Sequence, residues 1–155
     1  MSILQATSIA LSAGLFLAGI CSAQEKKIKR SDLPPAVEKA VGEVSKGATI
    51  KGFSEETDKG KTTYEVEMVV NGRSKDVELD PSGAIVEIEE QVAMDSLPAS
   101  VTAGLTAKSA GGKIRNVETI TKNGKLVAYE AHVDTAGKKS EIQVGPDGRP
   151  LDHQE

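Results

Sequence analysis

Two neighbouring segments of the chain alternate strictly between apolar and acidic side chains. In segment 64–68, Tyr, Val and Met occupy the even positions and Glu the odd ones, and in segment 76–80 Val and Leu alternate with Asp and Glu. A period of two is typical of a β-strand with one buried face. Asn71-Gly72 stands between the segments and favours a two-residue hairpin turn, because both residues tolerate positive φ. The pattern therefore predicts an antiparallel hairpin.

Further strands are expected at 50–57, 86–89, 114–121, 125–134 and 138–144. Asp80-Pro81-Ser82-Gly83 and Asn123-Gly124 have the composition of turns. Segments 50–57 and 114–121 alternate poorly, which predicts a β-bulge or an irregular first few residues in each of these two strands.

Two other segments place apolar side chains three to four residues apart, which predicts amphipathic helices. The stripe of the first comprises Leu33, Val37, Val41 and Val44. The stripe of the second comprises Leu97, Val101 and Leu105. The second segment also contains Thr102, Gly104 and Thr106, which are poor helix formers, so we expect it to be the weaker helix.

The chain also repeats its own pattern, since residues 33–37 correspond to 97–101, residues 64–67 to 129–132, and residues 80–83 to 145–148. We therefore expect an α+β fold of two repeats, 31–91 and 92–151, each with one helix and a four-stranded antiparallel meander. A unit of about 60 residues is only marginally stable alone, so we expect one shared sheet with both helices on one face. Residues 152–155 are expected to form a short tail.

Residues 1–23 carry no Lys, Arg, Asp or Glu. The run from Ile9 to Ile20 is apolar but shorter than the roughly 20 residues that a membrane-spanning helix needs, and Cys21-Ser22-Ala23 offers small residues to signal peptidase. We interpret 1–23 as a cleaved signal peptide followed by a basic linker, 24–30. The protein is then exported, periplasmic or secreted, with no membrane span after cleavage. An uncleaved anchor and lipidation of Cys21 are the alternatives.

The hairpin register fixes which side chains share a face of the sheet. If Val70 faces Arg73, then Glu65 lies opposite Glu78, and like charges that face each other destabilise a sheet. The candidate partner-binding face comprises Glu65, Glu67, Asp76, Glu78, Glu87, Glu89, Glu130, His132 and Glu141. Its functional interpretation is a docking surface for a cationic partner or for a cation such as Ca²⁺. The alternative is a solvated face that keeps the sheet soluble.

Composition and motifs exclude several functions. The 155 residues carry a net charge of −4, which disfavours nucleic-acid binding, and one Cys with two His excludes a Cys-rich zinc module or an iron–sulfur site. His132 is expected to face Glu141 as a surface pair rather than to bind metal. The sequence contains no nucleophile-elbow, zinc-protease or phosphate-loop motif. We therefore predict no catalytic residues, no cofactor and no metal site.

The motifs together resemble the PepSY-like family, also described as β-lactamase-inhibitor-like. The resemblance rests on the Leu-Pro-x-x-Val helix start at Leu33, the strand Tyr64-Glu65-Val66-Glu67 and the Pro-Ser-Gly turn at Pro81, and it covers about residues 31–151. The second repeat departs from the pattern at Ala131-His132. The resemblance implies an exported, non-enzymatic module that contacts or restrains an extracytoplasmic protein, peptide or peptidase. The alternative function is a cation-responsive or structural envelope protein that uses the acidic sheet face.

Overall fold

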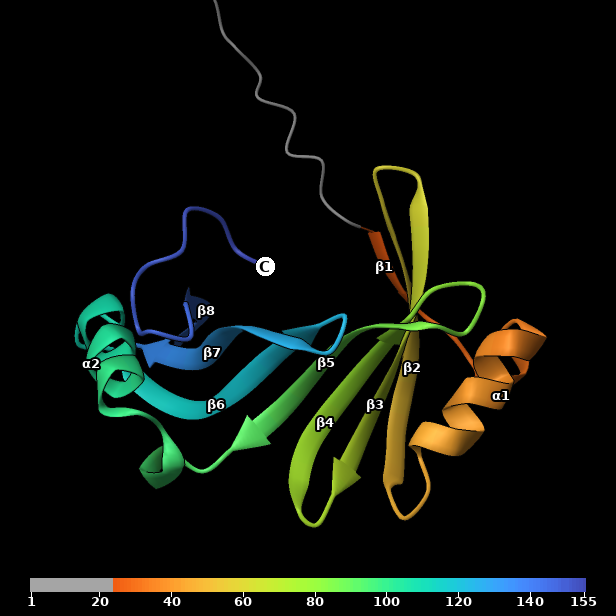
Figure 1. Ribbon diagram of the computed structural model, residues 1–155, viewed down its shortest axis with the longest axis horizontal. Helices are drawn as coiled ribbons and strands as arrows, with labels where there is room; N and C mark the ends of the chain where they lie inside the picture. Colours follow the sequence, from red (N-terminus) through yellow and green to blue (C-terminus); the bar gives the residue numbers. More distant parts are fainter. Residues whose placement is uncertain (1–23) are drawn as a thin grey trace, which may run out of the picture.

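The computed structural model describes residues 24–155, in which the chain forms one curled, antiparallel eight-stranded sheet and two α-helices (Figure 1). The strands lie in the sheet in the order in which they occur in the chain. They are β1 (Gln24–Lys27), β2 (Thr49–Asp58), β3 (Lys61–Val70), β4 (Arg73–Leu79), β5 (Ile85–Val92), β6 (Lys113–Lys122), β7 (Lys125–Thr135) and β8 (Lys138–Val144). The helices are α1 (Pro35–Val44) and α2 (Ala99–Lys108), and short 3₁₀-helices occupy Arg30–Asp32 and Met94–Ser96.

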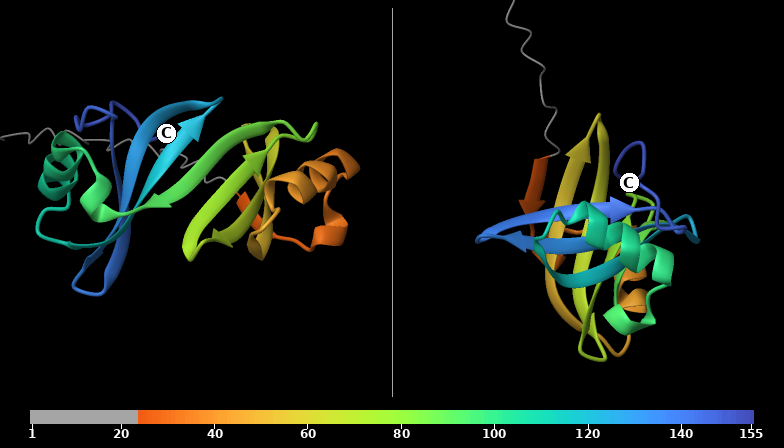
Figure 2. Two further views of the ribbon diagram at one scale, coloured as in Figure 1. Left: turned by 60° about the horizontal axis from the view of Figure 1, so that its bottom comes forward. Right: turned by 90° about the vertical axis from the view of Figure 1, so that its left-hand side faces the viewer.

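Each α-helix covers one end of the sheet with its apolar stripe. Val37 and Val41 of α1 pack on side chains of β3 and β4, and Val101 and Leu105 of α2 pack on side chains of β6, β7 and β8. Strand β5 joins the two ends, and the sheet twists so strongly that β6–β8 cross the direction of β2–β4 (Figure 2). The curl leaves the helices on the outer sides of the sheet (Figure 1).

The expectation of two repeats, each with one helix and a four-stranded meander, is wrong. The structure is one eight-stranded sheet that the helices divide unequally: one strand precedes α1, four lie between α1 and α2, and three follow α2. After β8 the chain turns at once, since Gly145 N donates to Arg149 O and Gly148 N donates to Gly145 O. Only a single bridge between Val144 and Pro150 remains there, because proline has no N–H to continue a ladder.

Residues 24–27 differ from the expectation of a linker at 24–30. Gln24–Lys27 form β1, which pairs with β2 from Gln24 opposite Thr57 to Lys27 opposite Ser54. This pairing covers the edge of β2, which would otherwise expose unpaired backbone groups. The signal peptide and the modification of Cys21 concern residues 1–23 and lie outside the described part of the chain.

The predicted irregularities in β2 and β6 are confirmed. The pairing of β2 with β3 shifts between Ile50 and Gly52, and that of β6 with β7 shifts between Ile114 and Asn116. In both strands this shift comes near the first residues. The pairing of β6 with β7 shifts a second time, between Ile120 and Thr121.

The hairpin turn at Asn71-Gly72 has the conformation that the sequence predicts, with φ of 51° and 83°. We expect Gly72→Ala to destabilise the protein by about 1 kcal/mol, because the added Cβ strains a left-handed residue. No atom lies within 4 Å of that Cβ, so the cost comes from the backbone alone. Urea unfolding measures it, and Gly72→Asn is the control, which should lose less. Equal losses in both variants would contradict the backbone explanation.

Candidate functional site

The face of the sheet opposite the helices carries acidic side chains on every strand from β3 to β8, and we call it the acidic face. The register of β3 and β4 is the predicted one, with Glu65 opposite Glu78 and Glu67 opposite Asp76. Strand β5 continues both rows, since Glu78 faces Glu87 and Asp76 faces Glu89. The acidic face comprises Glu65, Glu67, Asp76, Glu78, Glu87, Glu89, Glu118, Glu130, His132 and Glu141.

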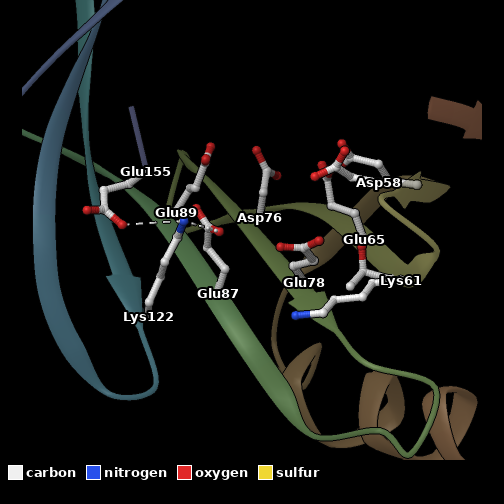
Figure 3. A pocket seen from close by; sticks show the side chains of 11 residues that line it. Asp58, Lys61, Glu65, Asp76, Glu78, Glu87, Glu89, Lys122 and Glu155 are labelled. Carbon is white, nitrogen blue, oxygen red and sulfur yellow. Dashed lines mark ion pairs between the residues drawn. The ribbon is translucent and has the colours of Figure 1, made fainter. Parts of the chain in front are cut away.

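The curl of the sheet folds the acidic face into two adjoining hollows. The first lies over β2–β6, and Figure 3 shows its carboxylates standing up from the strands. Lys122 bridges Glu87 at 3.4 Å and the C-terminal residue Glu155 at 3.6 Å. The second hollow extends from Glu25 of β1 to Glu141 of β8. The twist of the sheet therefore brings its first and last strands, β1 and β8, to the same concave surface.

Crowding and burial raise the pKa of several carboxyl groups on this face. Burial, and then the charges of Asp76 and Glu67, raise the pKa of Glu65 to about 7. Burial and the charge of Glu130 raise that of Glu89 to about 8. Burial and the charge of Glu118 raise the pKa of Asp76 to about 6. The acidic face is thus a set of carboxylates that repel one another, and a bound cation would relieve that repulsion.

His132 lies among three carboxylates at the β6–β8 end of this face. Its Nε2 is 3.0 Å from Glu118 Oε2 and 3.8 Å from Glu130 Oε1, and its Nδ1 is 3.6 Å from Glu141 Oε1. Burial lowers the pKa of the imidazole, but the hydrogen bond and charge of Glu118, with the charges of Glu130 and Glu141, outweigh burial and raise the pKa above 6.5. Glu141 faces His132 in the register, as predicted.

Glu118 and Glu130 are only 5% and 7% exposed, and polar neighbours hold one oxygen of each. Ser74 Oγ donates to Glu118 Oε1 at 2.6 Å, and Asn116 Nδ2 donates to the same oxygen at 3.3 Å. Gln143 Nε2 donates to Glu130 Oε2 at 2.8 Å. These contacts leave Glu118 Oε2 and Glu130 Oε1 on the side of His132.

All but one of the predicted site residues line the two hollows. The exception is Glu67, whose carboxylate lies over Gly52 of β2, where an added Cβ would come within 3.3 Å of Oε1. Glu118 was not among the predicted residues, although the sequence carries a signal for it: once a bulge near residue 115 is allowed, Val117 falls on the helix-covered face and Glu118 on the other. Glu25 and Glu155 were not predicted either, and they reach the hollows through the curl and the tail.

No family model matches the chain, and no curated protein matches it. Solved structures do resemble it. A protein from Bacteroides eggerthii that is assigned to the periplasm is 23% identical, with a TM-score of 0.62 over 79% of this chain and 88% of that one. A DUF2874 family protein from Bacteroides uniformis is 22% identical, with a TM-score of 0.57 over 75% of this chain and 84% of that one.

A BLIP-like protein from Bacteroides fragilis is 20% identical to the chain, with a TM-score of 0.53 over 77% of this chain and 83% of that one. The likeness establishes a BLIP-like fold, in agreement with the β-lactamase-inhibitor-like resemblance seen in the sequence. It does not extend to the PepSY-like name or to the two repeats. Among residues 24–155, neither helix has the length and apolar character needed to cross a membrane.

Proposed function

We propose that the protein is an exported, non-enzymatic binding module whose acidic face holds a Lys- or Arg-rich segment of another extracytoplasmic protein or peptide. The observation that carries the proposal is the concave acidic face itself. Carboxylates from all eight strands line its hollows. The basic side chains in the same linings are those of Lys61, Lys122 and His132. A cationic segment has the charge and the extended shape that complement such a surface.

The electrostatics of the acidic face favour binding of a positively charged partner. The raised pKa values of Glu65 and Glu89 show that ionised carboxylates are unfavourable there when no partner is bound. A lysine or arginine placed between them would stabilise the ionised forms. Opposite charge would also accelerate association, and both effects weaken with salt. Export is supported by the leader pattern of residues 1–23 and by the periplasmic assignment of the similar B. eggerthii protein.

The arrangement of polar groups supports a non-enzymatic role. A Ser-His-acid triad needs the hydroxyl to meet the imidazole, so that the imidazole can take its proton. Here Glu118 lies between Ser74 and His132, accepting from Ser74 Oγ with one oxygen and meeting Nε2 with the other. The order Ser–Glu–His is therefore not that of a triad, because the hydroxyl meets a carboxylate and not the imidazole.

Binding of a fluorescent decalysine peptide to the full mature protein tests the proposal. We expect binding at 20 mM NaCl that weakens about tenfold or more at 200 mM, because screening shortens the range of exposed charges. Glu78→Gln/Glu89→Gln should weaken binding at least about fivefold through lost complementarity on the acidic face. The control is Glu38→Gln/Glu43→Gln, which removes the same charge from exposed positions on α1. Equal affinities of the two double variants would refute docking on the acidic face.

The carboxylates also favour a second candidate, a cation-responsive protein, because Ca²⁺ prefers carboxylate oxygens. Calorimetry with CaCl₂ separates the two functions. Heat that disappears in Glu65→Gln/Glu67→Gln, together with decalysine binding that does not distinguish the variants above, would favour the cation-responsive protein. No calcium heat with face-specific decalysine binding would favour the docking module.

A further inference from the structure

We infer that Glu118, Glu130 and His132 form a binding site for a divalent transition-metal ion, with Zn²⁺ as the ion it fits. Glu118 lies on β6, Glu130 and His132 lie on β7, and one donor atom from each residue lies within 4.8 Å of the other two. The register places these residues side by side, since Glu118 faces Glu130 and Asn116 faces His132. This inference does not rest on the docking of a cationic segment.

The separations of His132 from the two carboxylates are close to those of a metal site. Ligands about 2.0–2.1 Å from a tetrahedral Zn²⁺ lie about 3.3 Å apart. The distances from His132 Nε2 to Glu118 Oε2 and Glu130 Oε1, 3.0 and 3.8 Å, bracket that value. The ion would take the place of the proton that Nε2 shares with Glu118.

The surroundings orient the donors toward one point. Ser74 and Asn116 donate to the other oxygen of Glu118, and Gln143 donates to the other oxygen of Glu130. Within residues 24–155, Glu130 Oε1 accepts no hydrogen bond, although the residue is only 7% exposed. Glu130 lines the second hollow and its Oε1 lies 3.8 Å from His132 Nε2, so this oxygen is free to meet a cation there. Glu141, 3.6 Å from Nδ1, is placed to hold the imidazole tautomer that leaves Nε2 free for the metal.

The donor set favours one class of ion. One imidazole nitrogen with two carboxylate oxygens suits Zn²⁺ and its neighbours in the first transition row, whereas Ca²⁺ takes six to eight oxygens. The three residues also line the second hollow, so the fourth position around the ion opens toward solvent or toward a bound molecule. The site therefore has the form of an open metal centre on the acidic face.

Calorimetry of the full mature protein with ZnCl₂ tests the inference, with Co²⁺ absorption spectra to report the coordination. We expect one ion per chain, and His132→Gln should weaken binding at least about 100-fold, since even second-shell losses cost 10–100-fold. Glu130→Gln should also weaken it. His153→Gln changes the other histidine and should leave affinity unchanged. Glu65→Gln/Glu67→Gln removes acidic-face charge from β3 but no donor atom, and it should change affinity less than threefold.

Nuclear magnetic resonance of the wild-type histidines keeps the test independent of how the variants fold. Zn²⁺ should shift the His132 imidazole signals and leave those of His153 in place. Absence of 1:1 binding, equal affinity of His132→Gln and the wild type, or a shift of His153 alone would each overturn the site. A loss of Zn²⁺ binding as large in Glu65→Gln/Glu67→Gln as in His132→Gln would also overturn it, because the ion would then sense only the general negative charge.

Discussion

Replacing Gly104 by alanine should destabilise the protein by about 3 kcal/mol or more, although alanine is the better helix former by about 1 kcal/mol. Gly104 lies in α2, where an added Cβ would come 2.0 Å from Gly148 O and 3.0 Å from its carbonyl carbon. Both are backbone atoms, so no side-chain rotation can relieve the overlap. The turn cannot withdraw easily, because Gly148 itself packs on Ser100 of the same helix, with φ of 82°.

Gly42→Ala is the matched control, since Gly42 lies in the last turn of α1 and its added Cβ would meet only Arg30 Nη2 at 4.0 Å. This variant should be more stable than the wild type by about 0.5–1 kcal/mol, the ordinary gain in helix propensity. Urea unfolding followed by circular dichroism measures both changes. A Gly104→Ala protein as stable as the wild type would show that α2 and the turn after β8 are not packed backbone to backbone.

The same contact explains a feature that the sequence analysis could only describe. Gly104 makes α2 a poor helix by composition, and the sequence offers no reason for it. The reason is long-range: the helix must leave space for a carbonyl of residue 148, which follows in the chain only after three strands. Local propensity therefore identified a weak position in α2 but could not identify its partner.

The parts of the fold and of the site that the sequence predicts are those determined by interactions between residues close together in the chain. Asn71-Gly72 imposes a two-residue turn, the turn fixes the register, and the register puts Glu65 and Glu78 side by side on one face. The same reasoning does not reach β1, because the residues Gln24–Lys27 have no apolar alternation to reveal a strand. The repeat pattern also predicts a further strand after β8. Pro150 prevents it, and only one bridge forms there.

The shape of the site depends on the whole sheet. Glu25 and Glu141 lie on β1 and β8 and share a hollow only because the twist accumulates over the strands between them. Glu118 was missed because the bulge near Ile114 shifts the alternation of β6 by one residue, and its exact place decides which face a carboxylate takes. Pattern alone therefore predicted an acidic face but neither its concavity nor the cluster around His132.

Replacing Glu65 by glutamine should stabilise the protein by about 2 kcal/mol at pH 8 and leave its stability unchanged at pH 4. The folded-state pKa of Glu65 is about 7, against an ordinary value of 4.5. Between pH 4.5 and pH 7 the folded state binds more protons than the unfolded state, so the free energy of unfolding falls as pH rises. Above pH 7 the full cost of ionising Glu65 in the folded state is present. Each pKa unit corresponds to about 1.4 kcal/mol, and partial solvent contact reduces the whole effect to about 2 kcal/mol.

The unfolding free energy of Glu65→Gln and of the wild type, measured by urea from pH 4 to pH 8, tests this expectation. The two curves should diverge mainly between pH 4.5 and pH 7, because glutamine imitates the protonated carboxyl at every pH.

Glu43→Gln is the control for net charge, because Glu43 is exposed on α1 and pairs with Lys46 at the surface. It should change stability by less than about 0.5 kcal/mol at either pH. A wild-type protein whose stability rises from pH 5 to pH 8 in parallel with that of Glu65→Gln would mean that Glu65 is ionised at no cost. The carboxylates of the first hollow would then be ordinary solvated groups, and the electrostatic support for a cationic partner would be lost with them.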